Sequence, residues 1–257
     1  MRILSLGWGV QSFTLAAMAA LGELNIHYAV HADTTWEREA TYTFAEHWTP
    51  WLKERGVEVR TVKSSRTAAV TQLNKTSVFI PAFTLDDRGN QGQLRRQCTK
   101  TWKIDPVRRF ISAIMRANGQ KLSPGAVTLL MGISLDEFHR MRTSDVKYIT
   151  HEYPLIERRM TRQDCLLWLE RHNLPSPGKS ACVFCPYHNG EAWKAMARVG
   201  GKDWGTAIAV DEQIRTKRPP FPLFVHASRK PLSEAVKDDG QLAMFQDTAC
   251  EGGFCHA

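Results

Sequence analysis

The stretch Ser5-Leu6-Gly7-Trp8-Gly9-Val10-Gln11-Ser12 joins an apolar segment to a helical pattern. Residues 2–6 predict a short buried strand, residues 7–11 a turn, and residues 12–21 a helix that ends near Gly22. Glycines between a strand and a helix let backbone N–H groups approach an anion, and the helix N-terminus adds partial positive charge. Neither G-x-x-x-x-G-K-[ST] nor G-x-G-x-x-G is complete here. The stretch favours phosphate binding, with a structural tight turn as the alternative.

Strand and helix patterns continue to alternate after this stretch. Further strands are predicted at residues 25–31, 57–62 and 126–133, and helices at 37–55, 101–118 and 161–173, the last with Thr161 as its N-cap. Strands that alternate with helices predict an α/β fold with a doubly wound parallel sheet. Ligands of such sheets bind at the carboxyl ends of the strands.

The chain divides by composition into two parts. Residues 64–95 have weak periodicity and predict a long excursion beside the site. Beyond about Pro175 the glycine, proline and cysteine content rises and the alternation of strands and helices stops. We therefore expect an α/β domain over residues 1–174, with a small, irregular, cysteine-containing region over residues 175–257 packed on it.

Composition excludes disordered and repeat proteins and indicates an anionic partner. The 257 residues are 43% hydrophobic and 23% charged, and 34 Lys+Arg against 26 Asp+Glu give a formal charge of +8. A field of this sign attracts nucleotides and nucleic acids. Glycines and polar residues interrupt the apolar N-terminal stretch, which disfavours a secretory signal, and no later run is long enough to span a bilayer. We expect a cytoplasmic protein without a membrane partner.

The six cysteines indicate metal or redox chemistry rather than disulfides, because a chain of this length buries its own core. Cys182 and Cys185 form a C-x-x-C pair before Pro186, and this spacing lets two thiolates converge on one metal or cluster. A buried apolar pair is the alternative. Cys165 falls in an apolar helical run and is expected in the core.

Several motifs, in order along the chain, resemble those of the PP-loop ATPase and phosphoadenosine-phosphosulfate (PAPS) reductase superfamily. The stretch at residues 5–12 is similar to its S-G-G-x-D-S pyrophosphate loop, although Trp8 stands in place of a glycine and Gln11 in place of an acidic residue. The other matching segments are Ala32-Asp33-Thr34 with Glu37 and Thr41, Gln97-Cys98-Thr99 with Lys103 and Pro106, Gly132–Glu137 with Arg140, Tyr153-Pro154-Leu155, and Ser180–Pro186.

The resemblance implies a HUP-like PP-loop fold and a nucleotide site. Its implied contacts to ATP are Ser5, Gly7, Gly9, Val10, Gln11, Ser12, Asp33, Thr34 and Gly132, with Asp136 and Arg140 in catalysis. Asp33 or Asp136 would help to hold Mg²⁺. The other interpretations are that Asp33 caps a helix starting near Trp36, and that Asp136 and Arg140 form an exposed i,i+4 pair.

The resemblance also brings distant cysteines to the C-x-x-C pair. It implies that Cys98, Cys182, Cys185 and Cys250 bind a [4Fe–4S] cluster, with Zn²⁺ as the alternative, and that Cys255 is a mobile catalytic thiol. A basic setting is expected to lower the pKa of Cys98. His226, Arg229 and Lys230 resemble another family segment and are candidates for substrate contact, with a surface role as the alternative.

The expected function follows from these two sites. It is ATP-dependent adenylation or activation of an acceptor, a nucleic acid such as tRNA or DNA, for iron–sulfur-assisted sulfur transfer, with a possible sulfur donor protein. The basic stretch formed by Arg95, Arg96, Lys100, Lys103, Arg108 and Arg109 would attract this polyanion, unless it is only a solvated helix face. One alternative is a PAPS- or APS-type reductase with Cys255 as nucleophile. The other is a zinc-stapled nucleic-acid-binding module.

Overall fold

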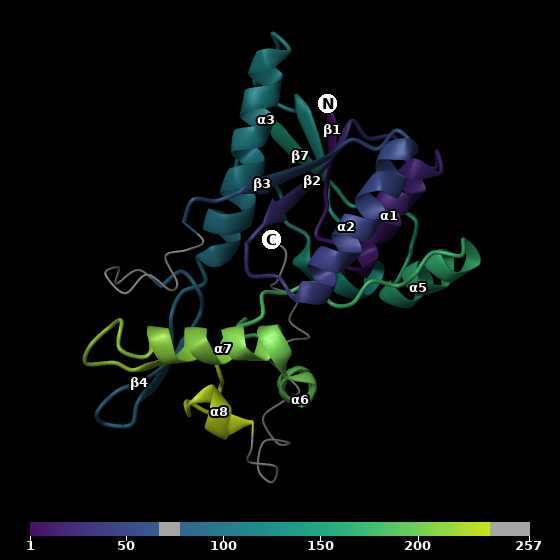
Figure 1. Ribbon diagram of the computed structural model, residues 1–257. Helices are drawn as coiled ribbons and strands as arrows, with labels where there is room; N and C mark the ends of the chain where they lie inside the picture. Colours follow the sequence, from purple (N-terminus) through teal and green to yellow (C-terminus); the bar gives the residue numbers. More distant parts are fainter. Residues whose placement is uncertain (67–77, 237–257) are drawn as a thin grey trace.

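A five-stranded, all-parallel sheet lies at the centre of the computed structural model, which describes residues 1–66 and 78–236 (Figure 1). Its strands are β1 (Arg2–Ser5), β2 (Tyr28–Asp33), β3 (Val59–Lys63), β6 (Val127–Leu130) and β7 (Ile149–Glu152), in the order β3-β2-β1-β6-β7. The order reverses at β1, where Leu4 lies opposite Ala29 of β2 and Leu130 of β6. The predicted α/β fold is confirmed, and its ligand crevice is expected beside β1.

Helices cover both faces of this sheet. Helices α1 (Val10–Ala20), α2 (Glu39–Glu54) and α5 (Arg162–Arg171) pack on one face, in a core that contains Leu4. Helix α3 (Asp105–Ala117) packs on the other face, in a core that contains Ile3. Strands that are buried on both faces need apolar residues at successive positions, and the adjacent Ile3 and Leu4 are the buried residues of β1, which was predicted correctly.

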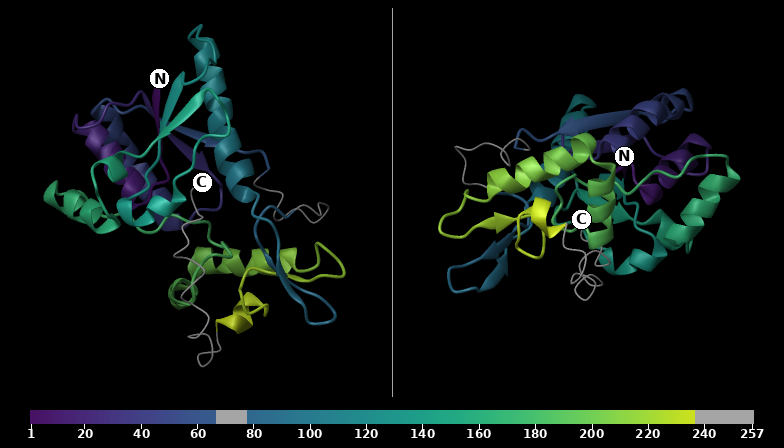
Figure 2. Two further views of the ribbon diagram at one scale, coloured as in Figure 1. Left: turned by 180° about the vertical axis from the view of Figure 1, so that it is seen from behind. Right: turned by 60° about the horizontal axis from the view of Figure 1, so that its bottom comes forward.

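A second apolar core lies beside the sheet. It combines residues 78–102 with residues 183–236 around Trp102, Phe184 and Trp193. Here a small antiparallel sheet has the order β5-β4-β8, formed by β4 (Phe83–Leu85), β5 (Gln91–Gln93) and β8 (Leu223–Phe224). Helices α6 (Gly190–Val199), α7 (Gly201–Ile214) and α8 (Leu232–Ala235) complete it, and all three views place the β4 segment beside α7 (Figures 1 and 2). The excursion thus belongs with the C-terminal region.

The structure differs from the sequence expectations in three places. The helix predicted at 101–118 is two elements, the π-helix η2 (Thr99–Ile104) and α3. Strand β7, the 3-10 helix η3 (Leu135–Arg140) and the short α4 (Pro154–Glu157) have no predicted counterpart. The region after Pro175 is more regular than its composition indicates, since it holds α6 and α7. The division at residue 174 stays a prediction. No helix in the described part of the chain has both the length and the apolarity to cross a membrane.

Candidate functional site

A cavity of about 420 Å³ opens at the carboxyl ends of the central strands. This volume lies within the range of small-molecule sites. The loop after β1 and the loop after β6 form its sides, as the reversal of strand order predicts. The sequence-predicted residues in its lining are Ser5, Gly7, Gly9, Gln11, Ser12, Gly132 and Arg140. We call this space the loop cavity.

The loop after β1 is closed on itself by Ser12. The Ser12 hydroxyl accepts a hydrogen bond from the Gly7 N–H at 3.1 Å and donates one to the Gly9 carbonyl at 3.2 Å. Trp8 has a φ of 57°, a conformation that favours glycine. The side chain of Val10 is buried in the core and does not line the cavity, so its predicted nucleotide contact rests on its backbone.

Glycine is required at position 132 for a steric reason. A Cβ on Gly132 would lie 2.9 Å from the Ser12 nitrogen and 3.0 Å from the Ser12 Cα, so the loop after β6 touches the start of α1. A Cβ on Gly9 would meet only the Ser180 Cβ, at 3.8 Å. Gly132 therefore allows the loop after β6 to pack directly against the start of α1, whereas the space beside the Gly9 backbone is open.

Of the predicted catalytic residues that the structure describes, Arg140 lines the loop cavity and Asp136 does not. Arg140 is only 7% exposed. Its Nη1 donates to Glu137 Oε2 at 2.7 Å, while Nε and Nη2 are buried without a hydrogen-bond partner. Gln11 donates from Nε2 to the same Glu137 oxygen at 3.1 Å. Unsatisfied guanidinium nitrogens beside a cavity fit an anionic ligand, because leaving them unpaired costs free energy.

Asp33 and Asp136 are engaged elsewhere. Asp33 Oδ1 accepts from the Thr35 N–H and the Tyr42 hydroxyl, and Oδ2 pairs with Lys63 at 3.0 Å. Burial alone would raise the pKa of Asp33, but these hydrogen bonds together hold that pKa below its usual value. Asp136 is exposed and accepts from the Arg162 N–H at the start of α5. Neither lines the loop cavity, so these carboxylates do not fit a Mg²⁺ ion bound there.

The structure contradicts the alternative interpretations of these two carboxylates, a helix cap and an i,i+4 ion pair. Helix α2 begins at Glu39 with Arg38 as its N-cap, so Asp33 is not the cap of that helix. Arg140 forms its ion pair with Glu137 rather than with Asp136. The acidic residue that the motif places nearest the loop is thus Glu137, which reaches Gln11 across the crevice.

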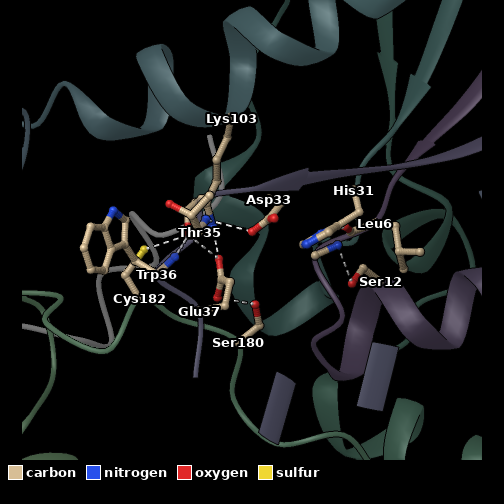
Figure 3. Close-up of polar contacts among 12 residues, drawn as sticks. Leu6, Ser12, His31, Asp33, Thr35, Trp36, Glu37, Lys103, Ser180 and Cys182 are labelled. Carbon is tan, nitrogen blue, oxygen red and sulfur yellow. Dashed lines mark hydrogen bonds and ion pairs between the residues drawn. The ribbon is translucent and has the colours of Figure 1, made fainter. Parts of the chain in front are cut away.

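Glu37 and Lys103 line the loop cavity and form an ion pair in which the Glu37 carboxylate is buried and the Lys103 side chain is partly exposed (Figure 3). The Glu37 carboxylate lies 3.5 Å from Lys103 Nζ and accepts hydrogen bonds from Ser180 at 3.2 Å and Thr34 at 3.3 Å. The Thr34 hydroxyl in turn lies 3.3 Å from Cys182 Sγ. Thr34 therefore contacts the cysteine region and does not line the loop cavity, where it was expected.

Three predicted metal ligands surround a second, smaller cavity. Cys98, Cys182 and Cys185 line a space of about 40 Å³, which we call the cysteine cavity. Arg96 and Lys103 also line it. Within residues 1–66 and 78–236 no three His, Cys, Asp or Glu side chains are grouped as a metal site. Cys250 and Cys255 lie outside the described residues. Thiols are the donor type that holds zinc or an iron–sulfur cluster, and the whole ligand set stays a prediction.

Burial controls the protonation of these thiols. Burial raises the pKa of Cys98, although Arg96 and Lys103 oppose this effect, so the expected lowering is wrong for the protein without a bound metal. Burial and the nearby Glu37 carboxylate raise the pKa of Cys182 further. Cys165 is fully buried in the core beside Thr14, as predicted, and burial raises its pKa to about 12.

Sequence reasoning did not foresee the contacts of four residues of this region. Glu37 and Ser180 were quoted only as parts of motifs and Lys103 as part of a motif and of the basic stretch, and their spacing gives no sign that they meet. His31 had no signal beyond its place at the end of a predicted strand. Its Nδ1 lies 3.0 Å from the Leu6 carbonyl, which can only accept, so Nδ1 carries the proton. Burial lowers the pKa of His31, which keeps the ring neutral beside the loop.

Comparisons with solved structures give 27 matching chains, of which two are described here. A phosphoadenylyl-sulfate (PAPS) reductase from Candida auris, in a phosphate complex, is 12% identical over 68% of this chain and 74% of its own, with a TM-score of 0.42. The U34-tRNA thiolase NcsA from Methanococcus maripaludis, with its [4Fe-4S] cluster, is 15% identical over 84% and 72%, with a TM-score of 0.39. No family model and no curated protein matches the chain.

Proposed function

We propose that this protein is an ATP-dependent PP-loop enzyme that activates a nucleic acid for iron–sulfur-assisted sulfur transfer. The observation that carries the proposal is that the loop cavity and the cysteine cavity share a wall, because Thr99 and Lys103 line both. A phosphate-type loop on one side and thiols on the other suit a reaction in which an oxygen is first activated and then replaced by sulfur.

The loop cavity supplies the groups for the first step. The backbone N–H groups at the start of α1 and the helix dipole attract the phosphates of ATP. Arg140 has two buried nitrogens for a phosphate oxygen, and Lys103 adds a cation at the wall between the cavities. An acceptor carbonyl oxygen would attack the α-phosphorus, and pyrophosphate would leave. These cations stabilise the negative charge that grows on the leaving group.

The cysteine cavity supplies the second step. Cys98, Cys182 and Cys185 would hold the cluster, and Cys250 is the proposed fourth ligand. Exogenous sulfide would have to displace Cys250 from its iron, and a [4Fe–4S] cluster loaded in this way would supply the sulfur nucleophile. The sulfur nucleophile forms a bond to the activated carbon, and AMP leaves with the original oxygen. The second step therefore needs a sulfur donor, which the proposal assigns to a separate protein.

The test is pyrophosphate release from ATP by the full chain purified without oxygen, with tRNA and with DNA. Replacing Arg140 by alanine should weaken ATP binding by about tenfold to a hundredfold, since a hydrogen bond to a charged group contributes roughly 1.5–3 kcal/mol. The matched control is Arg158→Ala, because Arg158 pairs with Glu23 away from both cavities. Equal ATP affinity in both variants would contradict the proposed nucleotide site.

Iron content tests the sulfur half of the proposal. Cys98→Ala, Cys182→Ala and Cys185→Ala should each lose iron, whereas the core variant Cys165→Ala should keep it. Sulfite release from PAPS without pyrophosphate release from ATP would favour a reductase. Stoichiometric zinc, with nucleic-acid binding but no ATP turnover, would favour the zinc-stapled module.

A further inference from the structure

We infer that the outward face of α3 is a groove that binds the phosphate backbone of the nucleic-acid acceptor. The inference rests on the proposed function, because it places the acceptor of that reaction. The groove has a volume of about 640 Å³ and lies between α3 and the residues that follow β3. It is separate from the nucleotide site, but Arg108 lines both the groove and the loop cavity.

The charge of the groove is strongly positive. Its lining contains four arginines, Arg66, Arg108, Arg109 and Arg116, against one carboxylate, Asp105. Arg108 pairs with Asp145 at the rim, and this contact keeps the pKa of Asp145 low. In the part of the chain that the structure describes, the other three arginines form no ion pair. Among the described residues, the groove therefore holds three guanidinium groups without an ion-pair partner, and four positive charges face one negative charge.

The spacing of the arginines follows one face of the helix. Positions 105, 108, 109, 112, 113 and 116 of α3 all line the groove, and they recur at the i, i+3, i+4, i+7 spacing of a single helical face. Arg109 and Arg116 are seven residues apart, which is about 10.5 Å along the axis at roughly 1.5 Å per residue. Three nucleotide steps of one strand cover about the same length at roughly 3.4 Å each.

The chemistry of the lining favours a nucleic-acid backbone. Guanidinium groups bind phosphate oxygens in pairs, and serine hydroxyls donate to the same oxygens. Three serines, Ser64, Ser65 and Ser112, stand among the arginines, and the described lining contains no aromatic ring on which a base could stack. A groove of this kind contacts the backbone without reading the sequence. Bases are then left to enter the loop cavity beyond Arg108.

The direction of α3 would bring a bound strand to the loop cavity and the cysteine cavity. Helix α3 continues directly from η2, whose Thr99 and Lys103 form the wall between the two cavities. Its far end extends away from α6 and α7 (Figure 1). A strand along this face therefore runs from the exposed end of α3 to the mouth of the loop cavity.

The experiment measures how the affinity for nucleic acid depends on salt. The full-length double variant Arg109→Ala/Arg116→Ala is compared with Arg171→Ala/Arg198→Ala, which removes the same charge from α5 and α6. The probes are a mixed-sequence single-stranded DNA, a tRNA and polyglutamate. The groove variant should lower the slope of log affinity against log salt by about 1.4–1.8, since each phosphate contact contributes roughly 0.7–0.9. The control should change the slope by less than half of that.

A second measurement separates this inference from the proposed function. ATP binding by the groove variant should equal that of the unaltered protein, because Arg109 and Arg116 do not line the loop cavity. Equal slopes in the two double variants, or tighter binding of polyglutamate than of DNA and tRNA, would overturn the groove as a nucleic-acid site. Absence of ATP binding by the unaltered protein, with the groove effect intact, would overturn the proposed function alone.

Discussion

At the scale of single residues, two glycines of the loop cavity serve different purposes. Gly132 has no room for a methyl group, because Ser12 backbone atoms lie 2.9–3.0 Å from the position of its Cβ. Gly9 has room within the protein, so the packing of the fold does not require its lack of a side chain. The motif resemblance marks both positions but does not distinguish these roles.

Substitution at Gly9 should therefore affect ATP binding, and substitution at Gly132 should affect stability. Gly9→Val should weaken ATP binding while leaving the thermal midpoint unchanged, because the new side chain crowds the approach of phosphate to the backbone. Gly132→Ala should lower the free energy of unfolding by about 1–3 kcal/mol, as overpacking does. Calorimetric titration with ATP and urea unfolding measure the two effects. Unchanged ATP affinity in a folded Gly9→Val protein would remove the loop from the site.

At the scale of elements, helix boundaries follow local chemistry that the sequence displays. Thr161 and Asp164 form a capping box at the start of α5, in which the Thr161 side chain accepts from the Asp164 N–H and Asp164 accepts from the Thr161 N–H at 2.8 Å. The predicted N-cap is therefore confirmed. The hydrogen bonds from Thr161 also hold the pKa of Asp164 below its ordinary value.

Removal of this cap should cost measurable stability. Thr161→Ala should lower the free energy of unfolding by about 1 kcal/mol, because the Asp164 N–H loses its partner. Thr43→Ala in the exposed part of α2 is the matched control and should change stability by less than about 0.5 kcal/mol. Urea midpoints of the two variants give the comparison. Equal midpoints would show that the cap contributes nothing.

The elements that the sequence did not predict depend on contacts between distant segments. Strand β7 is short, and β6 supplies its pairing from Val127 to Leu130. The β4 hairpin pairs with β8 from the other end of the chain, and Arg229 donates to the Thr84 carbonyl at 3.0 Å. Periodicity within a window carries no information about such partners. For the same reason the Glu37–Lys103 pair could not be predicted, since the fold alone brings it together.

At the scale of the whole molecule, the second core holds a buried histidine. His226 is 5% exposed beside Trp193, and its Nδ1 accepts from the Ser228 N–H at 3.1 Å. His226, a candidate for substrate contact, lines neither cavity and is instead buried in the core. Burial lowers the pKa of His226 from 6.5 to about 4.

This histidine should make the fold sensitive to mild acid. The unfolded chain binds a proton below about pH 6.5, whereas the folded chain does so only near pH 4, so stability is full above pH 6.5 and falls as the pH drops toward 4. Between pH 7 and pH 5 the loss from His226 alone should be about 2 kcal/mol. His226→Gln should reduce the difference between the urea midpoints at these two pH values. If the urea midpoint changed between pH 7 and pH 5 by the same amount in the wild-type protein and in the variant, His226 would not be the source of the acid sensitivity.

The unusual backbone at Trp8 also determines how freely the loop after β1 can adapt. A tryptophan at φ 57° carries a strain of about 1–2 kcal/mol, and its ring is buried against Phe13, Phe44 and His31. This aromatic anchor fixes the loop before any ligand arrives, so little conformational entropy remains to be lost on binding. The same rigidity restricts binding to ligands that fit the present shape of the loop. A wider loop would require the Trp8 ring to leave its position between α1 and α2.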